Sequence, residues 1–177
     1  MWREVVFIGR RWGRPDGSVG CTTRGVPMFS GNFAHTVDDK GRVAIPARFR
    51  EELSRLQDEL IFVTKWKRRE CPCLDAVPAS DFLKLQRKMR RHQRFEQKRQ
   101  TLESFYIGSA QDVRLDAQNR LLIPPQLREW AKIGREVMLA GANDRFRIWN
   151  KELFHQVDRE DEQALFENAD FMNELEL

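Results

Sequence analysis

Apolar and polar residues follow the same pattern in two stretches of the chain that lie 78 residues apart. His35–Leu53 reads HTVDDKGRVAIPARFREEL and Val113–Ala131 reads VRLDAQNRLLIPPQLREWA, and the two align without a gap. In each stretch an apolar run reaches a short polar segment, a second apolar run follows, and apolar residues then recur at helical spacing. Each stretch therefore predicts a β-hairpin followed by a short helix, and the repeat predicts two copies of one supersecondary unit.

The polar segment between the two apolar runs has the chemistry of a tight turn. Both copies read Asp-x-x-x-Arg, with Asp38 and Arg42 in the first copy and Asp116 and Arg120 in the second. Aspartate starts turns by bonding its own backbone, and glycine and asparagine tolerate a left-handed backbone. The proline after each second apolar run favours a strand before it and a helix after it. The residues that we expect to form the turns are Asp38, Gly41, Asp116 and Asn119.

The rest of the chain predicts further strands, two more helices and a helical connection between the copies. The expected strands are Leu60–Thr64, Leu74–Val77, Val137–Ala140 and Phe146–Trp149, and helices are expected after Pro78 and Asn150. We divide the chain into a first repeat (28–82), a helical linker (83–108), a second repeat (109–155) and an acidic tail (156–177). Residues 1–27 are rich in Gly and Arg without periodicity, which predicts a disordered segment, either a non-native extension or a basic arm that contacts phosphates.

Charge is distributed unevenly along the chain. The net charge is +4, but residues 150–177 carry nine acids against Lys151 and Arg159, so residues 1–149 carry +11. This asymmetry favours a basic body that binds a polyanion, followed by an acidic tail. Alternatively, the oppositely charged ends could pair with those of a partner chain. No apolar run approaches the length of a membrane span. Three cysteines, an odd number, argue against a disulfide scaffold and favour a reducing cytoplasm.

From Met28 to about Phe154 the chain resembles the MraZ family, bacterial DNA-binding transcriptional regulators made of two AbrB-like halves. The resemblance is carried by the doubled Asp-x-x-x-Arg…Ile-Pro pattern together with MFSGNF (28–33), FYIGSAQDV (105–113) and EVMLAGANDRFRIWNKELF (136–154). It implies an α+β fold, a double-split β-barrel of two AbrB-like pseudo-repeats with linking helices. It also implies a ring-shaped homo-oligomer that binds double-stranded DNA in the cytoplasm, associated with the nucleoid, without a cofactor.

The function that this resemblance implies is sequence-specific regulation of the division and cell-wall gene cluster. The expected target is a set of G-rich direct repeats upstream of the protein's own operon. One alternative is an AbrB-like antitoxin or a protein-interaction scaffold without a specific DNA target, and a third is an RNA-binding module. Two repeats and a structured linker argue against the antitoxin, because AbrB-like antitoxins normally have one such unit. No phosphate-binding loop, nucleophile motif or catalytic acid pair is present in the sequence, so we do not expect an enzyme.

The two turns are the candidate DNA-binding site. A two-stranded β-ribbon fits the major groove, and arginine is well suited to a bidentate contact with guanine. Alternatively, the Asp–Arg pairs of each turn are internal salt bridges that stiffen it, and both roles can coexist, since a carboxylate can orient a guanidinium. Lys40 is placed for a phosphate, and Gln118 offers a neutral amide at the same position. The expected DNA-binding residues are Lys40, Arg42, Arg48, Gln118 and Arg120.

Three other features have weaker interpretations. Arg50 and Arg128 recur in both copies and either bind phosphate or pair with a neighbouring acid, and we favour the pairing. The basic run between 84 and 99 in the linker is expected to be a solvated face, with a second phosphate contact as the alternative. Cys71-Pro-Cys73 is expected to be a loop with two free thiols, because no second Cys or His pair lies near it for a metal site.

Overall fold

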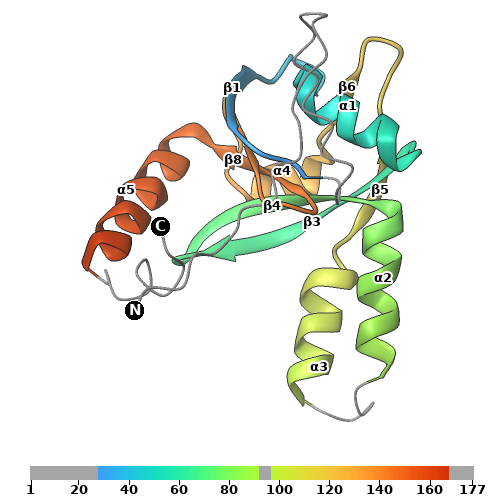
Figure 1. The fold of residues 1–177 in the computed structure, drawn as a ribbon. Coiled ribbons are helices and arrows are strands. Elements are labelled where there is room, and N and C mark those ends of the chain that lie inside the picture. The colour runs from blue at the N-terminus through green and yellow to red at the C-terminus, as the bar shows by residue number, and fades with distance from the viewer. Residues whose placement is uncertain (1–27, 92–96, 168–177) are drawn as a thin grey trace, which may run out of the picture.

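The structure, a computed structural model, describes residues 28–91 and 97–167. The expectations for residues 1–27 and for the end of the acidic tail lie outside these described residues. The chain is a mixed α/β protein whose two repeats share an antiparallel sheet (Figure 1).

The order of elements follows the repeat. The first copy contains β1 (Asn32–Thr36), β2 (Arg42–Ala44), α1 (Ala47–Leu56), β3 (Leu60–Arg68) and β4 (Cys71–Pro78). The connection contains α2 (Ala79–Arg90), α3 (Gln97–Leu102) and the π-helical turn η1 (Glu103–Ile107). The second copy contains β5 (Gln111–Arg114), β6 (Arg120–Leu122), α4 (Pro125–Trp130), β7 (Glu136–Gly141), β8 (Phe146–Asn150) and α5 (Lys151–Glu167).

The helices after the turns begin and end as their sequence indicates. Pro46 and Pro124 precede α1 and α4 in extended geometry, with ψ angles of 144° and 134°. The α1 helix ends at Gln57, which adopts a left-handed conformation and donates its backbone N–H to the last carbonyls of the helix. Phe49 and Leu127 point from the two helices into the core and are 0% and 1% exposed. The predicted helical spacing is therefore confirmed in both copies.

The two copies exchange strands, and this corrects the expected hairpins. The six-stranded sheet has the order β1-β7-β8-β4-β3-β5, and β2 pairs with β6 in a separate two-stranded ribbon. The first strand of each copy thus pairs with a strand of the other copy: β1 with β7, in register from Asn32–Ala140 to Thr36–Glu136, and β5 with β3. Within one copy, the strands that flank the turn meet in one bridge, Val37–Val43 or Leu115–Leu121. The predicted hairpin is therefore confirmed at its turn and its first bridge in each copy, but the two strands that flank the turn belong to different sheets.

One core lies beneath both turns. Val43 and Leu121, paired across the β2·β6 ribbon, are both 0% exposed and join the side chains of α1, α4 and the large sheet. Fully burying one such aliphatic side chain stabilises the fold by about 1.5–3 kcal/mol. The repeats therefore fold as one unit, and the sequence boundaries drawn between them stay predictions. A double-split barrel also stays a prediction, because the pairings of the described strands leave β1 and β5 as the two ends of the sheet.

A buried ionic network fixes the linker to the sheet. Asp75 on β4 is 1% exposed and accepts hydrogen bonds from the Tyr106 hydroxyl at 2.8 Å, Arg145 Nη1 at 3.2 Å and Arg147 Nε at 3.0 Å. Burial raises the pKa of Tyr106, so its hydroxyl remains a donor to the carboxylate. Loss of one partner from a buried pair of this kind destabilises a protein by about 3–5 kcal/mol. The network therefore holds η1, β4 and β8 in a fixed relation.

Beyond this network the linker forms an arm. Phe82 of α2 stacks on Phe62 of β3 with ring centroids 4.3 Å apart, which attaches the base of the arm. From there α2 and α3 extend away from the sheet, at the opposite end of the molecule from β6 and α1 (Figure 1). The arm and the ribbon β2·β6 thus face different directions.

Candidate nucleic-acid interface

Both turns adopt the same geometry. Asp38 Oδ1 accepts the backbone N–H groups of Lys40 at 3.0 Å and Arg42 at 2.9 Å, and the Gly41 N–H donates to the Asp38 carbonyl at 2.9 Å. Asp116 accepts from Gln118 at 2.9 Å and Arg120 at 3.0 Å in the same way.

The left-handed position of each turn is occupied as the sequence predicts. Gly41 has a φ angle of +82° and Asn119 of +58°. These are the residue types that adopt this backbone conformation at the lowest strain. Asp38 and Asp116 thus accept the backbone N–H groups of the turns, and Gly41 and Asn119 occupy their left-handed positions.

Strand exchange brings the two turns together into one cluster of four charged side chains. Arg42 donates from Nε to Asp38 Oδ2 at 2.8 Å, and Arg120 donates from Nε to Asp116 Oδ2 at 2.9 Å. Each guanidinium also approaches the aspartate of the other turn, at 3.7 Å for Arg42–Asp116 and 3.5 Å for Arg120–Asp38. We call Asp38, Arg42, Asp116 and Arg120 the turn cluster. The internal salt bridges weighed from the sequence are therefore present, and they extend between the copies.

Both aspartates of the turn cluster are ionised near neutral pH. Hydrogen bonding to the Arg42 guanidinium, followed by the Arg42 backbone N–H, lowers the pKa of Asp38 to about 2. The Arg120 guanidinium, followed by the Arg120 backbone N–H, likewise lowers the pKa of Asp116. With both carboxylates charged, the cluster has no net charge. It can orient two guanidinium groups, but it does not by itself attract a polyanion.

Each guanidinium keeps part of its donor surface open. The Nε–Nη2 edge of Arg42 faces Asp38 Oδ2, with both contacts at 2.8 Å. The Nη1–Nη2 edge has only the longer approach to Asp116, and 26% of the side chain is exposed. Arg120 is 27% exposed in the equivalent arrangement. Because a guanidinium has five N–H donors in a rigid fork, a second planar acceptor can bind the edge that the aspartate leaves open.

The turn cluster lies on the outer face of the ribbon β2·β6. Arg42 pairs with Leu122, and Ala44 pairs with Arg120, while the alternate pair of Val43 and Leu121 faces the core. Each turn is also attached to the strand of the other copy, since Ile45 N–H donates to Asn119 O at 3.0 Å and Ile123 N–H donates to Gly41 O at 2.9 Å. The two turns are therefore one rigid unit.

Two grooves flank this unit, and their charges differ. The groove beside the first turn, of about 440 Å³, is lined by three basic residues, Lys40, Arg128 and Lys132, against Asp39 and Glu129. The groove beside the second turn, of about 660 Å³, is lined by Arg50 and Arg114 against three acids, Asp58, Glu59 and Asp116. Lys132 was not predicted, because it follows α4 and reaches the first turn only through the exchange of strands.

The remaining predicted residues lie outside the turn cluster. Lys40 and Gln118 are exposed at the two turns, and Arg48 is exposed in the first turn of α1. Arg128 Nε donates to the carbonyl of Ile133 at 3.2 Å. Among the described residues neither Arg50 nor Arg128 lies within ion-pair distance of an acid, so the favoured pairing with an acid was wrong.

The chain is similar to known proteins over most of its length. The family model described as "MraZ protein, putative antitoxin-like" matches residues 28–104 and 106–174. The chain belongs to the MraZ family. It is 34% identical over 149 residues to a "Transcriptional regulator MraZ" of Pseudomonas putida, which covers 84% of this chain and 97% of that protein. A relative of the same name from Syntrophobacter fumaroxidans is 34% identical over 146 residues, covering 81% of this chain and 95% of that protein.

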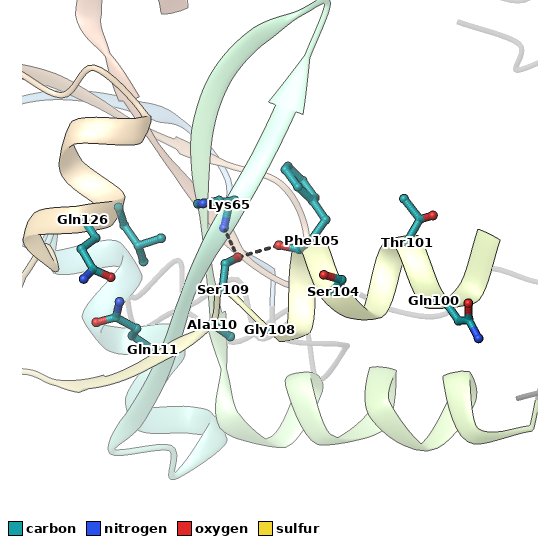
Figure 2. Close-up of a pocket in the computed structure, with 11 residues that line it drawn as sticks. Lys65, Gln100, Thr101, Ser104, Phe105, Gly108, Ser109, Ala110, Gln111 and Gln126 are labelled. Carbon is teal, nitrogen blue, oxygen red and sulfur yellow. Dashed lines mark hydrogen bonds between the residues drawn. The ribbon is translucent and has the colours of Figure 1, made fainter. Parts of the chain in front are cut away.

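A polar groove lies elsewhere in this MraZ-family chain. It has a volume of about 800 Å³ and lies between η1, β3 and α4, where Figure 2 shows hydroxyl and amide side chains around Lys65. Ser109 Oγ accepts the Lys65 backbone N–H at 3.3 Å and donates to the Phe105 carbonyl at 2.6 Å (Figure 2). None of the described residues that line it is acidic, so the groove contains no pair of catalytic carboxylates.

The two neighbouring cysteines lie in the interior of the fold. Cys71 and Cys73 are on strand β4 and are 7% and 0% exposed, packed with Met138 and Trp149. Burial raises the pKa of the Cys73 thiol, so it stays protonated. The expectation of a loop was wrong, because β3 continues through Arg68 and turns at Arg69 and Glu70, so that Cys71 and Cys73 lie on the return strand of a long hairpin. Within the described residues no three His, Cys, Asp or Glu side chains are grouped so as to bind a metal.

Charged residues away from the turns of this MraZ-family chain also form internal ion pairs. Asp161 on α5 accepts from Arg68 Nε at 2.6 Å and from Arg69 Nε at 2.5 Å, which attaches the acidic helix to the turn between β3 and β4. On the arm, Lys84 pairs with Asp81 at 2.8 Å. No helix of the described residues has both the length and the apolar character needed to cross a membrane.

Proposed function

We propose that the protein is a sequence-specific DNA-binding transcriptional regulator, and that its base-reading unit is the joined pair of turns. The observation that carries this proposal is the turn cluster, in which two arginines are held by aspartates on the outer face of one two-stranded ribbon. The names of the relatives, transcriptional regulators, support the same class of function. A ribbon of two strands has the dimensions to enter the major groove of B-DNA.

In the proposed complex the aspartates orient the two arginine side chains, and the arginines contact the DNA bases. Asp38 holds the Nε–Nη2 edge of Arg42, and the Nη1–Nη2 edge donates to the O6 and N7 atoms of a guanine. Arg120 does the same at a second guanine, with Asp116 as its support. Because a rigid ribbon joins the two arginines, both guanines lie within one short stretch of duplex. This arrangement suits a G-rich target, such as direct repeats upstream of the operon in the division and cell-wall gene cluster.

In this proposal the groups that attract the DNA phosphate backbone lie outside the turn cluster, which has no net charge. Lys40, Arg128 and Lys132 line the groove beside the first turn, and Arg48 is exposed on the following helix. Lysine and arginine side chains at such positions bind phosphates and release counterions. Gln118 replaces Lys40 at the second turn and donates an uncharged hydrogen bond. The first turn therefore binds the backbone more strongly than the second.

The proposed assembly is a ring-shaped homo-oligomer that presents several ribbons on one face, in the cytoplasm and on the nucleoid. Adjacent ribbons are held at a fixed separation in such a ring. Once one ribbon is bound, its neighbour would therefore meet a second direct repeat on the same side of the duplex at high effective concentration. We propose no cofactor and no catalytic activity. The main alternative, an antitoxin or protein-interaction scaffold, is favoured only by the antitoxin-like description of the family.

The test is a titration of the DNA upstream of the protein's own gene, against scrambled DNA and against RNA of the same sequence. Wild-type protein is compared with Arg42→Ala, Arg120→Ala and Lys84→Ala, the last being a matched loss of one positive charge on the distant arm. We expect Arg42→Ala to abolish the preference for the upstream DNA, Arg120→Ala to reduce it, and Lys84→Ala to retain it. Each lost guanine contact is worth about 1–3 kcal/mol.

Stability is measured in the same variants. Because the side chains of the turn cluster are partly exposed, removal of one guanidinium should lower the free energy of unfolding only slightly. Unfolding or disassembly of Arg42→Ala would show that the turn cluster is purely structural. Equal binding of upstream DNA, scrambled DNA and RNA by the wild-type protein would overturn the proposed function.

A further inference from the structure

Leu122 is an exposed apolar side chain in the middle of the proposed reading surface. It is 45% exposed, between Leu121 at 0% and Ile123 at 1%. The large apolar residues of the described chain that are comparably exposed are Met28, Leu83, Leu102, Leu165 and Phe166, and none of these lies on a β-strand. Leu122 therefore keeps the inside–outside alternation of β6 but places an apolar group on the outer face.

The position of Leu122 connects it to the first turn. It pairs with Arg42 across the ribbon β2·β6. A Cβ atom built on Gly41 would lie 3.8 Å from Leu122 Cδ1, so this methyl group lies over the backbone of the Asp38–Arg42 turn. The outer face beside Arg42 consequently consists of a guanidinium edge and a branched aliphatic group next to each other.

The second turn lacks this apolar group. The residue equivalent to Leu122 in the first copy is Ala44, which pairs with Arg120. The repeat thus places one arginine beside a leucine and the other beside a single methyl group. Since the two turns otherwise have the same hydrogen bonds, this substitution is the main difference in shape between the two halves of the ribbon face.

Resting on the proposed function, we infer that Leu122 is a specificity-determining residue that contacts the 5-methyl group of a thymine next to the guanine bound by Arg42. Thymine is the base that presents an apolar group in the major groove, at the edge that an arginine on the same ribbon faces. An apolar side chain that is exposed in the free protein gains affinity by covering this methyl group, because apolar surface is then removed from water. Ala44 reaches less far and makes no equivalent contact.

The test uses full-length protein and a duplex selected by it from a random-sequence library. Each thymine of the selected duplex is replaced in turn by uracil, which removes the 5-methyl group and leaves the base-pairing edge unchanged. Dissociation constants are measured at fixed salt for the wild type, Leu122→Ala and Leu122→Thr. Leu83→Ala is the matched control, because Leu83 is also 45% exposed but lies on the arm. Leu122→Thr keeps a residue that favours β-structure, so loss of the ribbon does not explain its effect.

In the wild type and in Leu83→Ala, uracil at one position should weaken binding about three- to tenfold. In Leu122→Ala and Leu122→Thr, whose side chains reach less far, the penalty of the same replacement should fall below about twofold, while both variants still require Arg42. The inference is overturned if no uracil replacement weakens wild-type binding, or if the penalty persists in both Leu122 variants. Failure of the proposed function is a different result, namely that the library yields no preferred sequence at all.

Discussion

At the scale of single residues, one short motif has a structural role that is compatible with the recognition role proposed for it. Asp38 accepts two backbone N–H groups of its own turn through Oδ1 and holds the Arg42 side chain through Oδ2. The same carboxylate thus shapes the turn and fixes the guanidinium. The two interpretations of the Asp–Arg pair drawn from the sequence, salt bridge and DNA contact, are physically compatible for this reason.

The pKa of Asp38 leads to a prediction about pH. Because its pKa is lowered to about 2 in the folded protein, the charged form stabilises the fold above the pKa of the unfolded chain and that stabilisation is lost as pH falls toward 2. We expect the difference in melting temperature between the wild type and Asp38→Asn to be constant from about pH 8 to about pH 5 and to shrink below about pH 4. Thermal denaturation across this range measures it. Asp39→Asn, an exposed neighbour outside the turn cluster, is the control, and a difference that already changes near pH 6 would contradict the assignment.

At the scale of elements, the conformation of each turn is determined by its own residues, but the pairing of the strands that flank it is not. The left-handed positions of the two turns illustrate the local part, since Gly41 and Asn119 are recognisable from residue type alone. Their equivalence gives a test with a matched control.

Gly41→Ala should destabilise the protein by about 1–2 kcal/mol, because alanine pays the strain of a positive φ angle. The nearest atoms that a new Cβ would meet are at 3.6 Å or more, so crowding adds little. Gly41→Asn should be nearly neutral, because asparagine occupies this position in the second turn at a φ angle of +58°. Chemical denaturation of the two variants measures the difference. Equal destabilisation by Ala and Asn would mean that the space around Gly41, and not its backbone conformation, is decisive.

The sequence predicted the elements better than their arrangement. The turn residues, the helices after Ile-Pro and the strands around Leu60 and Val137 follow from local chemistry. Strand partners do not, because β1 pairs with β7, about a hundred residues away, through a register set by the common core. For the same reason the contacts between the two turns, and the place of Lys132 beside the first, could not be predicted. Cys71 and Cys73 were misassigned because polar neighbours on a hairpin turn resemble a loop.

At the scale of the whole molecule, two groups of basic residues face different directions. One group surrounds the first turn, and the other covers the arm of α2 and α3 at the opposite end of the molecule (Figure 1). A straight duplex bound at the ribbon does not pass along the arm of the same protomer. The charge of the arm should therefore contribute little to binding at the ribbon.

The dependence of DNA affinity on salt concentration distinguishes the two groups of basic residues. Lys40→Ala and Lys132→Ala should each reduce the slope of log affinity against log salt concentration by about one unit, because each removes a phosphate contact. Arg87→Gln and Arg90→Gln, on the exposed surface of the arm, should leave the slope unchanged. The measurement is a titration of upstream DNA at several salt concentrations. A smaller slope in the arm variants would favour the phosphate-contact interpretation of the linker, and would require a neighbouring protomer to place the arm near the duplex.

The central claim is that two turns, joined by strand exchange, read two guanines as one unit. The most direct measurement replaces single guanines of the selected duplex by 7-deazaguanine, which removes the N7 acceptor, and determines the affinities of wild type, Arg42→Ala and Arg120→Ala. Two replacements should each weaken wild-type binding about five- to a hundredfold. Arg42→Ala should lose sensitivity at one of these guanines and keep it at the other, and Arg120→Ala should show the converse. If both variants keep both sensitivities, the arginines of the turn cluster do not contact the bases, and the account is wrong.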